Sequence, residues 1–453
     1  MRRGWTSFLR AGSALGLLVI ATAQADAGGF AVREQSTYGQ GTSFAGVAAG
    51  GALSSMFWNP ATITQVPGVV SESGVTGIFP HATQNPISAN APPGAPFGGI
   101  SLLPFGGMQN SGEMGMPLNS YFSYQINPSI WLGMSINAPY GLMVNFNELW
   151  AGRNYGLPSS LKTYNASPTI AWRINDWISV GAGVQIQYAK ADLRFGFAPA
   201  FMSEIMLEGL KGWGYGATAG LTLTPGPRTT IGIGWRSGIN QKVDGTLVVN
   251  PALPGATPGG ISTTVNLPDT VSAGIRHRFD ERWTVMGTAE WTNWSRLGTV
   301  TFTGPTGGPA TVGTSTGPVA VALPFQYRDG WFFSGGAEYQ WSERLALRSG
   351  IAFERSPVSD QVRMPAIPDN DRFWLSVGAS WQIFPGVMWF DLAYSHIWVK
   401  DPSINITAAS GNPWFNGFSY TGDVDAHVDI FSGSLVWRFG AGPAPKKAPL
   451  ITK

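Results

Sequence analysis

The sequence contains no cysteine and few charged residues. Among its 453 residues, the absence of Cys excludes disulfides, thiolate zinc sites and thiol nucleophiles. Asp, Glu, Lys and Arg together make up only 12% of the chain, and the formal net charge of +2 is not gathered in a basic block. We therefore expect no nucleic-acid partner, and we expect stability to come from noncovalent bonds such as the inter-strand hydrogen bonds of a closed barrel.

Long apolar runs are also absent beyond the N-terminus, so no later segment is predicted to span a membrane as a helix, which takes about 20 residues. Three arginines within the first ten residues precede a short apolar run, 11–23, and small residues follow, which is typical of an export signal. We predict a signal peptide over residues 1–27, cleaved after Ala25 or after Ala27. An anchor helix is the less favoured alternative because the run is short. An exported chain of this kind can be periplasmic, secreted or an outer-membrane barrel.

Glycine and aromatic residues are abundant, with 60 Gly, 25 Phe and 19 Trp, and apolar and polar side chains alternate with a period of two. The alternation is clearest over 372–383, where only Trp374 departs from it. In a barrel wall successive side chains face lipid and lumen in turn, so this pattern favours strands that cross a bilayer. The residues expected on the lipid face of this segment are Phe373, Leu375, Val377, Ala379, Trp381 and Ile383.

The connections between these strands alternate between tight turns and long loops, as in a barrel with both chain ends in the periplasm. Tight turns are predicted at 127–128, 175–176, 225–227, 280–281, 342–343 and 384–386. Long loops are predicted at 80–116, 141–160, 196–213, 245–265, 296–324, 356–369 and 401–422. The fold class that follows is all-β, a transmembrane antiparallel β-barrel of about fourteen strands over residues 68–439.

Tryptophans cluster near the expected strand ends, where amphipathic rings favour the membrane interface. A soluble β-sandwich could also show the alternation, but it would not need aromatic residues at both ends of its outward rows, so it is the less favoured alternative. The tryptophans concerned are Trp131, Trp177, Trp283, Trp341, Trp389 and Trp437.

The two ends of the mature chain lack the alternation. Residues 28–67 are rich in Gly, Ala and Ser and too apolar for a free tail, which favours an N-terminal plug inside the barrel lumen. Residues 440–453 follow Phe439, the aromatic residue on which such barrels commonly end, and are predicted to form a periplasmic tail.

Several short motifs are distributed along the mature chain. They are Gly29-Phe30-Ala31-Val32 and Asn59-Pro60-Ala61 in the plug, then Leu267-Pro268-Asp269-Thr270, Glu290-Trp291-Thr292-Asn293-Trp294-Ser295 and Asp371-Arg372-Phe373-Trp374-Leu375-Ser376. No single motif is specific, but their order and spacing are. Over essentially the whole mature chain the sequence resembles the FadL family of outer-membrane transporters of hydrophobic compounds.

The resemblance implies a fourteen-stranded barrel closed by an N-terminal hatch, with a ligand pocket near residues 29–32 and a lateral exit through a kink in the third strand. Here the expected third strand runs into Pro139, Tyr140 and Gly141. Proline cannot donate a ladder hydrogen bond and glycine tolerates unusual dihedrals, so a break in the wall is expected at this point, the alternative being a simple strand end. The segment Asn59-Pro60-Ala61 would be a rigid turn that holds the hatch against the wall, or a bare turn.

The resemblance also implies the function and the partners. We expect passive, ligand-triggered uptake of long-chain fatty acids or other hydrophobic compounds across the outer membrane of a Gram-negative bacterium, with aromatic hydrocarbon uptake as the alternative within the family. The expected partners are the ligand, outer-membrane lipid and lipopolysaccharide, and the barrel assembly machinery. No cofactor is expected, and the protein is expected to be a monomer.

The segment from Phe195 to Trp213 is apolar although it is expected to face water. Its apolar residues recur at helical spacing after Pro199, which predicts a loop helix. An exposed apolar patch favours ligand capture, and the alternative is a lid that packs on its neighbours. The candidate capture residues are Phe195, Phe197, Phe201, Met202, Ile205, Met206 and Leu210.

Charged residues also occupy strand positions that could face inward. We expect them to pair across the lumen and to hold the hatch, and the sharper hypothesis is that one Arg or Lys meets a fatty-acid carboxylate. The sequence does not indicate which one. The residues are Arg173, Arg276, Arg278, Glu290, Glu338, Arg348, Glu354 and Asp391.

The sequence supports an enzyme or a general porin less well than a transporter of hydrophobic compounds. The four histidines are not in a metal-ligand spacing, and we expect no metal site. The nearest candidate for an outer-membrane lipase pair is Ser395-His396, but adjacent strand residues point to opposite faces. A general porin is disfavoured because an open pore has no reason to carry a plug.

Overall fold

The computed structural model describes residues 28–93, 98–196, 202–250, 256–314 and 317–440. The predicted signal peptide, the candidate capture residues Phe197 and Phe201, and the predicted tail beyond Gly440 lie outside the described residues.

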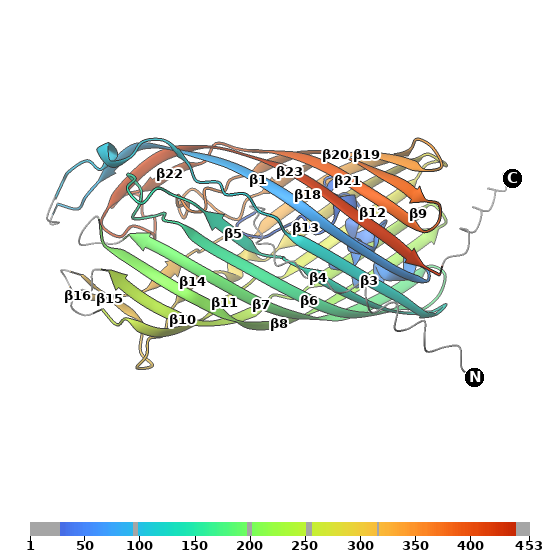
Figure 1. Ribbon diagram of the computed structural model, residues 1–453, viewed down its shortest axis with the longest axis horizontal. Coiled ribbons are helices and arrows are strands. Elements are labelled where there is room, and N and C mark those ends of the chain that lie inside the picture. The colour runs from blue at the N-terminus through green and yellow to red at the C-terminus, as the bar shows by residue number, and fades with distance from the viewer. Residues whose placement is uncertain (1–27, 94–97, 197–201, 251–255, 315–316, 441–453) are drawn as a thin grey trace.

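Within these residues, fourteen antiparallel strand positions follow one another round a closed barrel, and pairing of the first with the last closes it (Figure 1). In order round the barrel they are β1 (Val69–Asn90), β3 (Leu118–Asn127), β4 (Ile130–Asn137) with β5 (Gly141–Val144), β6 (Ser159–Arg173), β7 (Ile178–Gly196), β8 (Glu204–Gly226), β9 (Thr229–Arg236) with β10 (Asn240–Asn250), β11 (Gly259–Asn266) with β12 (Thr270–Arg278), β13 (Trp283–Thr292), β18 (Gly330–Gln340), β19 (Leu345–Arg355), β20 (Arg372–Phe384), β21 (Met388–Val399) and β23 (Ser419–Phe439). The shorter strands are β2 (Gln109–Asn110), β14 (Thr299–Thr301), β15 (Thr311–Thr314), β16 (Gly317–Ala320), β17 (Ala322–Pro324) and β22 (Ser403–Ile406).

The alternation of side chains produces one outward apolar face and one filled interior. In β20, Phe373, Leu375 and Val377 are exposed, whereas Arg372 is buried on the inner face. Trp374, the exception in the pattern, points inward and is completely buried. The predicted fold class, an all-β barrel of fourteen strands with a hatch in its lumen, is confirmed.

The hatch, residues 28–67, folds inside the end of the barrel where the tight turns lie (Figure 1). It contains the short helices α2 (Thr37–Gln40), η2 (Val47–Ala49), η3 (Leu53–Phe57) and η4 (Pro60–Gln65), while η5 (Leu103–Phe105) and η6 (Trp294–Arg296) lie in the long loops. None of the helices in the described part of the chain is long and apolar enough to cross a membrane.

The interior contains two separate apolar clusters. The lower cluster joins the hatch to the wall, and its members include Val32, Phe44, Leu53, Met56, Phe57, Trp58, Ile63, Tyr121, Trp131, Phe332 and Trp374. The upper cluster fills the end of the barrel where the long loops lie. Its members include Phe30, Leu142, Phe146, Trp150, Tyr155, Leu207, Leu210, Ile239, Leu267, Trp294, Tyr327 and Tyr420. Phe30 and Val32, two residues apart, belong to different clusters, so the start of the hatch lies at the boundary between them.

Several predicted loops are wrong because the strands continue well beyond the outward apolar band. β1 reaches Asn90, β10 reaches Asn250, and β8 begins at Glu204, so parts of the predicted loops 80–116, 196–213 and 245–265 are strand. The upper halves of β8 and β10 pair with both neighbours, which satisfies their backbone hydrogen bonds without helix formation.

The predicted loop helix after Pro199 is also wrong from Glu204 onward, because these residues belong to β8. Gly209 has a φ of +59°, its N–H donates to Asp192 Oδ1 at 2.7 Å, and the register with β7 shifts between Ala191 and Leu193. A bulge of this kind places two residues opposite one, so the inward-facing Leu207 and Leu210 are three positions apart. A separation of three positions between apolar residues is also typical of an amphipathic helix, which explains the wrong prediction.

Candidate functional site

The third strand of the barrel is interrupted between β4 and β5, and the start of the hatch occupies the interruption. Val32 N–H donates to the Pro139 carbonyl and Gly141 N–H donates to the Phe30 carbonyl, both at 2.9 Å. Ala31 and Tyr140 thereby form an antiparallel bridge. The hatch thus supplies the strand contacts that the wall lacks at Pro139, where the ring leaves no backbone N–H to donate.

Two further interruptions, between β9 and β10 and between β11 and β12, differ from the first because the wall closes them itself. Leu267 N–H donates to the Ile239 carbonyl at 2.9 Å, and Gly238 N–H donates to Asp269 Oδ1 at 2.9 Å. Arg296 forms a salt bridge of 2.8 Å with the same aspartate. Of these three interruptions, the one at Pro139 is therefore closed by the hatch, and the other two are closed by the wall.

Phe30 anchors the hatch in the upper cluster through aromatic contacts. Its ring centroid lies 5.0 Å from that of Trp294, and 6.1 Å from those of Tyr140 and Phe325. Tyr327 and Trp414 extend the same group of rings through Phe325. An apolar molecule that replaced Phe30 would find an aromatic site already assembled.

Buried charges hold the first residues of the hatch. Arg33 pairs with Glu290 at 2.8 Å and lies 3.7 Å from Glu354. Gly29 N–H donates to Asp369 Oδ2 at 2.8 Å, and the same carboxylate pairs with Arg372. An unpaired charge is costly to bury, so these contacts favour the position of the hatch at the interruption.

The segment Asn59-Pro60-Ala61 begins η4 and holds the hatch to the wall. Asn59 Oδ1 accepts from Ala61 N–H at 3.0 Å, while Nδ2 donates to the carbonyls of Ala48 at 2.7 Å and Leu221 at 2.9 Å. The wall is glycine here because a Cβ on Gly220 would lie 1.9 Å from Asn59 Oδ1. The buried amide thus caps a helix, closes a hatch turn and bonds to β8.

Replacing Asn59 by Ala should loosen the hatch, because it removes the side-chain donor to the Ala48 and Leu221 carbonyls and the acceptor of the Ala61 N–H. The expected cost is about 2 kcal/mol, or roughly 30-fold faster amide exchange in the hatch. Hydrogen exchange with mass spectrometry measures this. Thr64→Ala is the matched control because Thr64 Oγ1 bonds only within the hatch, to the Ala61 carbonyl. Equal protection in Asn59→Ala and the parent would contradict the assigned role.

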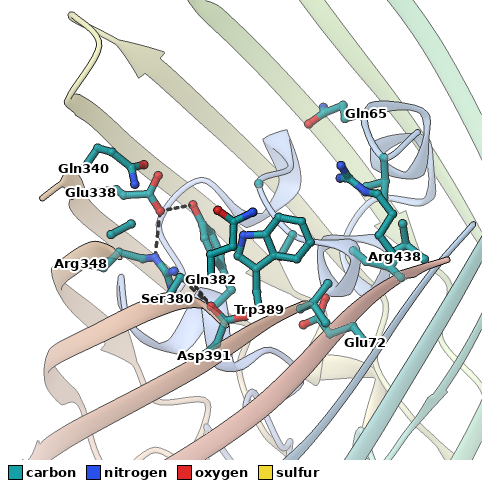
Figure 2. A pocket seen from close by; sticks show the side chains of 18 of the residues that line it. Gln65, Glu72, Glu338, Gln340, Arg348, Ser380, Gln382, Trp389, Asp391 and Arg438 are labelled. Atoms are coloured by element: carbon teal, nitrogen blue, oxygen red, sulfur yellow. Dashed lines mark hydrogen bonds and ion pairs between the residues drawn. The ribbon is translucent and has the colours of Figure 1, made fainter. Parts of the chain in front are cut away.

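The inward-facing charges below the hatch form a network around Tyr38 of α2. Its hydroxyl donates to Glu338 at 2.8 Å and accepts from Arg276 at 2.9 Å. Arg348 pairs with Glu338 at 2.9 Å and with Asp391 at 3.3 Å, as Figure 2 shows. These groups line a cavity of about 330 Å³ beneath the hatch, together with Glu72, Trp389 and Arg438. This cavity is polar, unlike the upper cluster.

The remaining predicted inward charges lie elsewhere. Arg173 donates to the Thr64 carbonyl of the hatch and stacks on Trp131, with its guanidinium carbon 4.8 Å from the ring centroid. Arg278 is exposed at the end of β12.

The candidate capture residues that the structure describes do not form one exposed patch. Leu210 is buried in the upper cluster, Phe195 and Ile205 pack against it, Met206 is half-buried, and Met202 is 57% exposed. Four charges lie beside them and tie the loop 145–158 to β7 and β8. Glu204 pairs with Arg153 and Arg194, each at 2.8 Å, and Arg194 pairs with Glu148 at 2.8 Å.

Tyr155 closes the same loop toward the start of β23. Its hydroxyl donates to Asn416 Oδ1 at 2.9 Å, and burial raises its pKa, so it remains a neutral donor. Of the described candidate capture residues, Leu210 is thus buried and Phe195, Ile205 and Met206 are partly buried, beside the loop 145–158, while Met202 remains exposed.

Several interior residues were missing from the sequence prediction, among them Arg153, Arg363 and Arg236. Arg236, at the end of β9, donates from Nη1 to the Phe57 carbonyl at 3.0 Å and stacks on the Phe57 ring, with 4.1 Å from its guanidinium carbon to the centroid. Nothing in the local pattern distinguishes it from other strand arginines. Within the described residues, no group of three or more His, Asp or Glu is arranged to hold a metal ion.

Comparison with known proteins gives consistent matches. The family described as outer membrane protein transport protein (OMPP1/FadL/TodX) matches residues 18–439. The long-chain fatty acid transport protein of Escherichia coli (strain K12) is 27% identical over 420 residues, which cover 83% of this chain and 89% of that protein.

Solved structures match in fold. A Pseudomonas aeruginosa FadL homologue has a TM-score of 0.78 at 22% identity, and the match covers 91% of this chain and 100% of that one. The Pseudomonas putida toluene transporter TodX has a TM-score of 0.65 at 15% identity, with coverage of 86% and 95%. At these identities the likeness to both structures concerns the fold alone.

Proposed function

The chain belongs to the OMPP1/FadL/TodX family of Gram-negative outer membrane transport proteins for hydrophobic compounds, and we propose that its own ligands are long-chain fatty acids. The relative that is 27% identical bears the name long-chain fatty acid transport protein. The observation that carries the proposal is the position of residues 30–32, which close the interruption at Pro139 while Phe30 fills part of the upper cluster. A ligand that displaced them would open the site and the wall together.

In this proposal, uptake is passive and proceeds in three steps. The apolar side chains of Phe195, Met202, Ile205, Met206 and Leu210 receive the ligand after the loop 145–158 moves. The ligand then takes the place of Phe30 in the upper cluster. Release of the Ala31–Tyr140 bridge opens a lateral exit beside Pro139, through which an apolar chain enters the outer leaflet. The polar cavity beneath the hatch disfavours a downward path, because an apolar chain gains nothing by entering it.

An aromatic hydrocarbon is the second candidate ligand. The rings that surround Phe30, among them Trp294, Tyr140 and Phe325, would suit a small aromatic molecule as well as they suit an acyl chain. The fold likeness to a toluene transporter is compatible with either ligand.

Uptake of oleate and of toluene by a transporter-deficient Gram-negative strain that expresses this chain separates the two candidates. The proposal expects saturable oleate uptake well above the strain without the protein, and little toluene uptake. Preferential toluene uptake would replace the fatty acid by an aromatic hydrocarbon. Free permeation of hydrophilic sugars without uptake of either compound would contradict transport of hydrophobic ligands altogether.

A further inference from the structure

Arg236 differs from the other buried arginines in having no carboxylate partner. In the part of the chain that the structure describes, five arginines are less than 9% exposed: Arg153, Arg236, Arg348, Arg363 and Arg372. Four of them lie within 3.3 Å of an Asp or Glu oxygen. Arg236 donates instead to neutral acceptors, the Phe57 carbonyl at 3.0 Å and Gln185 Oε1 at 2.5 Å.

The surroundings of Arg236 do not neutralise its charge. Among the described residues, no Asp or Glu forms an ion pair with Arg236, and Glu290 is bonded to Arg33 at 2.8 Å. Burial of an unpaired charge is costly, and neutral hydrogen bonds compensate only part of the cost. An incoming anion would therefore be bound more strongly here than at an arginine that is already paired.

The position of Arg236 suits the head group of an amphiphile in the upper cluster. Three residues further along the chain, Ile239 belongs to the upper cluster, whereas Phe57, on which Arg236 stacks, belongs to the lower one. Gln185, Gln187 and Gln241 lie together on the adjoining wall, joined by a Gln187–Gln241 hydrogen bond of 3.1 Å. Arg236 thus places a buried positive charge at the lower boundary of the upper cluster, beside a row of amides. This arrangement suits a carboxylate that carries an apolar chain.

We infer that Arg236 is the residue that binds the carboxylate of a fatty acid and, by doing so, releases the hatch. This inference rests on the proposed function and specifies its ligand as an anionic rather than a neutral amphiphile. A carboxylate bound by both terminal nitrogens of the guanidinium would replace the Phe57 carbonyl as acceptor. Phe57 lies two residues before Asn59, so the loss of this bond loosens the hatch next to its anchor on β8.

A purely structural role is the competing explanation, and the chain contains a matched residue that isolates it. Arg173 also donates to a hatch carbonyl, that of Thr64, and also stacks on an aromatic ring, that of Trp131. Trp131 belongs to the lower cluster, and Arg173 is the last residue of β6, next to a tight turn. If Arg236 only stabilises the position of the hatch, Arg173→Gln should change ligand binding in the same way as Arg236→Gln.

The experiment measures binding of oleate and of oleyl alcohol, which has the same chain without the charge, to purified protein in lipid nanodiscs. Arg236→Gln keeps a donor for the Phe57 carbonyl and removes the charge. We expect it to weaken oleate binding by about tenfold to a hundredfold while oleyl alcohol binding changes less than about twofold. Arg173→Gln should leave the ratio of the two affinities at its parent value.

Every outcome distinguishes the role of Arg236 from the transport function. Equal losses for oleate and oleyl alcohol, or no loss for either, would overturn the role of Arg236 and leave fatty-acid transport standing. A parent protein that binds neither compound but takes up toluene would overturn both. Arg236→Met, which removes the buried charge and keeps a stem over Phe57, serves as the second variant if Arg236→Gln does not give a heat-modifiable barrel band on electrophoresis.

Discussion

Uptake of hydrophobic ligands should fall to the background of the expression strain when Ala31 and Tyr140 are both replaced by Cys and oxidised. The two residues face each other in an antiparallel bridge, flanked by the hydrogen bonds Val32 to Pro139 and Gly141 to Phe30. This makes them a non-hydrogen-bonded pair, whose Cα separation of about 4.5 Å falls within the range for disulfides. The crosslink would fix the hatch across the interruption, and the parent chain has no cysteine to interfere.

The measurement is oleate uptake before and after reduction of the same cells, and reduction should restore it. Ser43→Cys with Ser376→Cys is the matched control, because their Oγ atoms lie 2.7 Å apart and join another part of the hatch to β20. That crosslink leaves residues 29–32 free, so uptake should persist. Undiminished uptake with a fully formed disulfide between positions 31 and 140 would show that the interruption is not the exit.

Glu290→Ala should detach the start of the hatch from the wall. Glu290 is the 2.8 Å partner of Arg33, and Glu354 at 3.7 Å is a poor substitute. Removal of one member of a buried ion pair costs about 3–5 kcal/mol because the other charge remains buried and uncompensated. The Val32 N–H, bonded to the Pro139 carbonyl, should therefore exchange at least about a hundredfold faster. Local hydrogen exchange of the peptide that contains Val32 measures this.

The double variant Arg33→Met with Glu290→Ala tests whether the uncompensated charge of Arg33 causes the faster exchange. Because it removes both charges, protection at Val32 should return most of the way to the parent value, as is found when buried ion pairs are replaced by apolar residues. Additive losses from the two substitutions would instead mean that Arg33 and Glu290 stabilise the hatch through separate contacts, for example Arg33 through its stacking on Phe332.

The period of two predicted the wall of the barrel because every residue of a strand must face either the lipid or the lumen. In β20 the lipid-facing row follows directly from the alternation. The exception, Trp374, could not be placed from the pattern, because its inward position depends on the hatch: it packs on Phe44 with ring centroids 6.0 Å apart. Trp131, expected at the membrane interface, is likewise buried, and its indole donates to the Val66 carbonyl of the hatch.

The interior site was less predictable because it is assembled from segments far apart in the chain. Pro139 and Gly141 could be identified from their backbone chemistry, but nothing local indicates that residues 30–32 lie against them. Arg236 is an ordinary strand arginine in sequence. Its unusual property is the lack of a carboxylate among its hydrogen-bond partners, and those partners come from the hatch and from β7.

The pairing of β1 with β23 has a consequence for the order of folding. Val69 and Phe439 are partners across this pair although nearly the whole chain separates them, and the hatch ends immediately before β1. Contacts of such sequence separation form late, because a long loop must be closed before they contribute any stability. Closure of the barrel therefore encloses the hatch in the same event. A hatch that had not reached its position by then would have to refold within a finished wall, so errors of assembly should appear as closed barrels with misplaced N-termini.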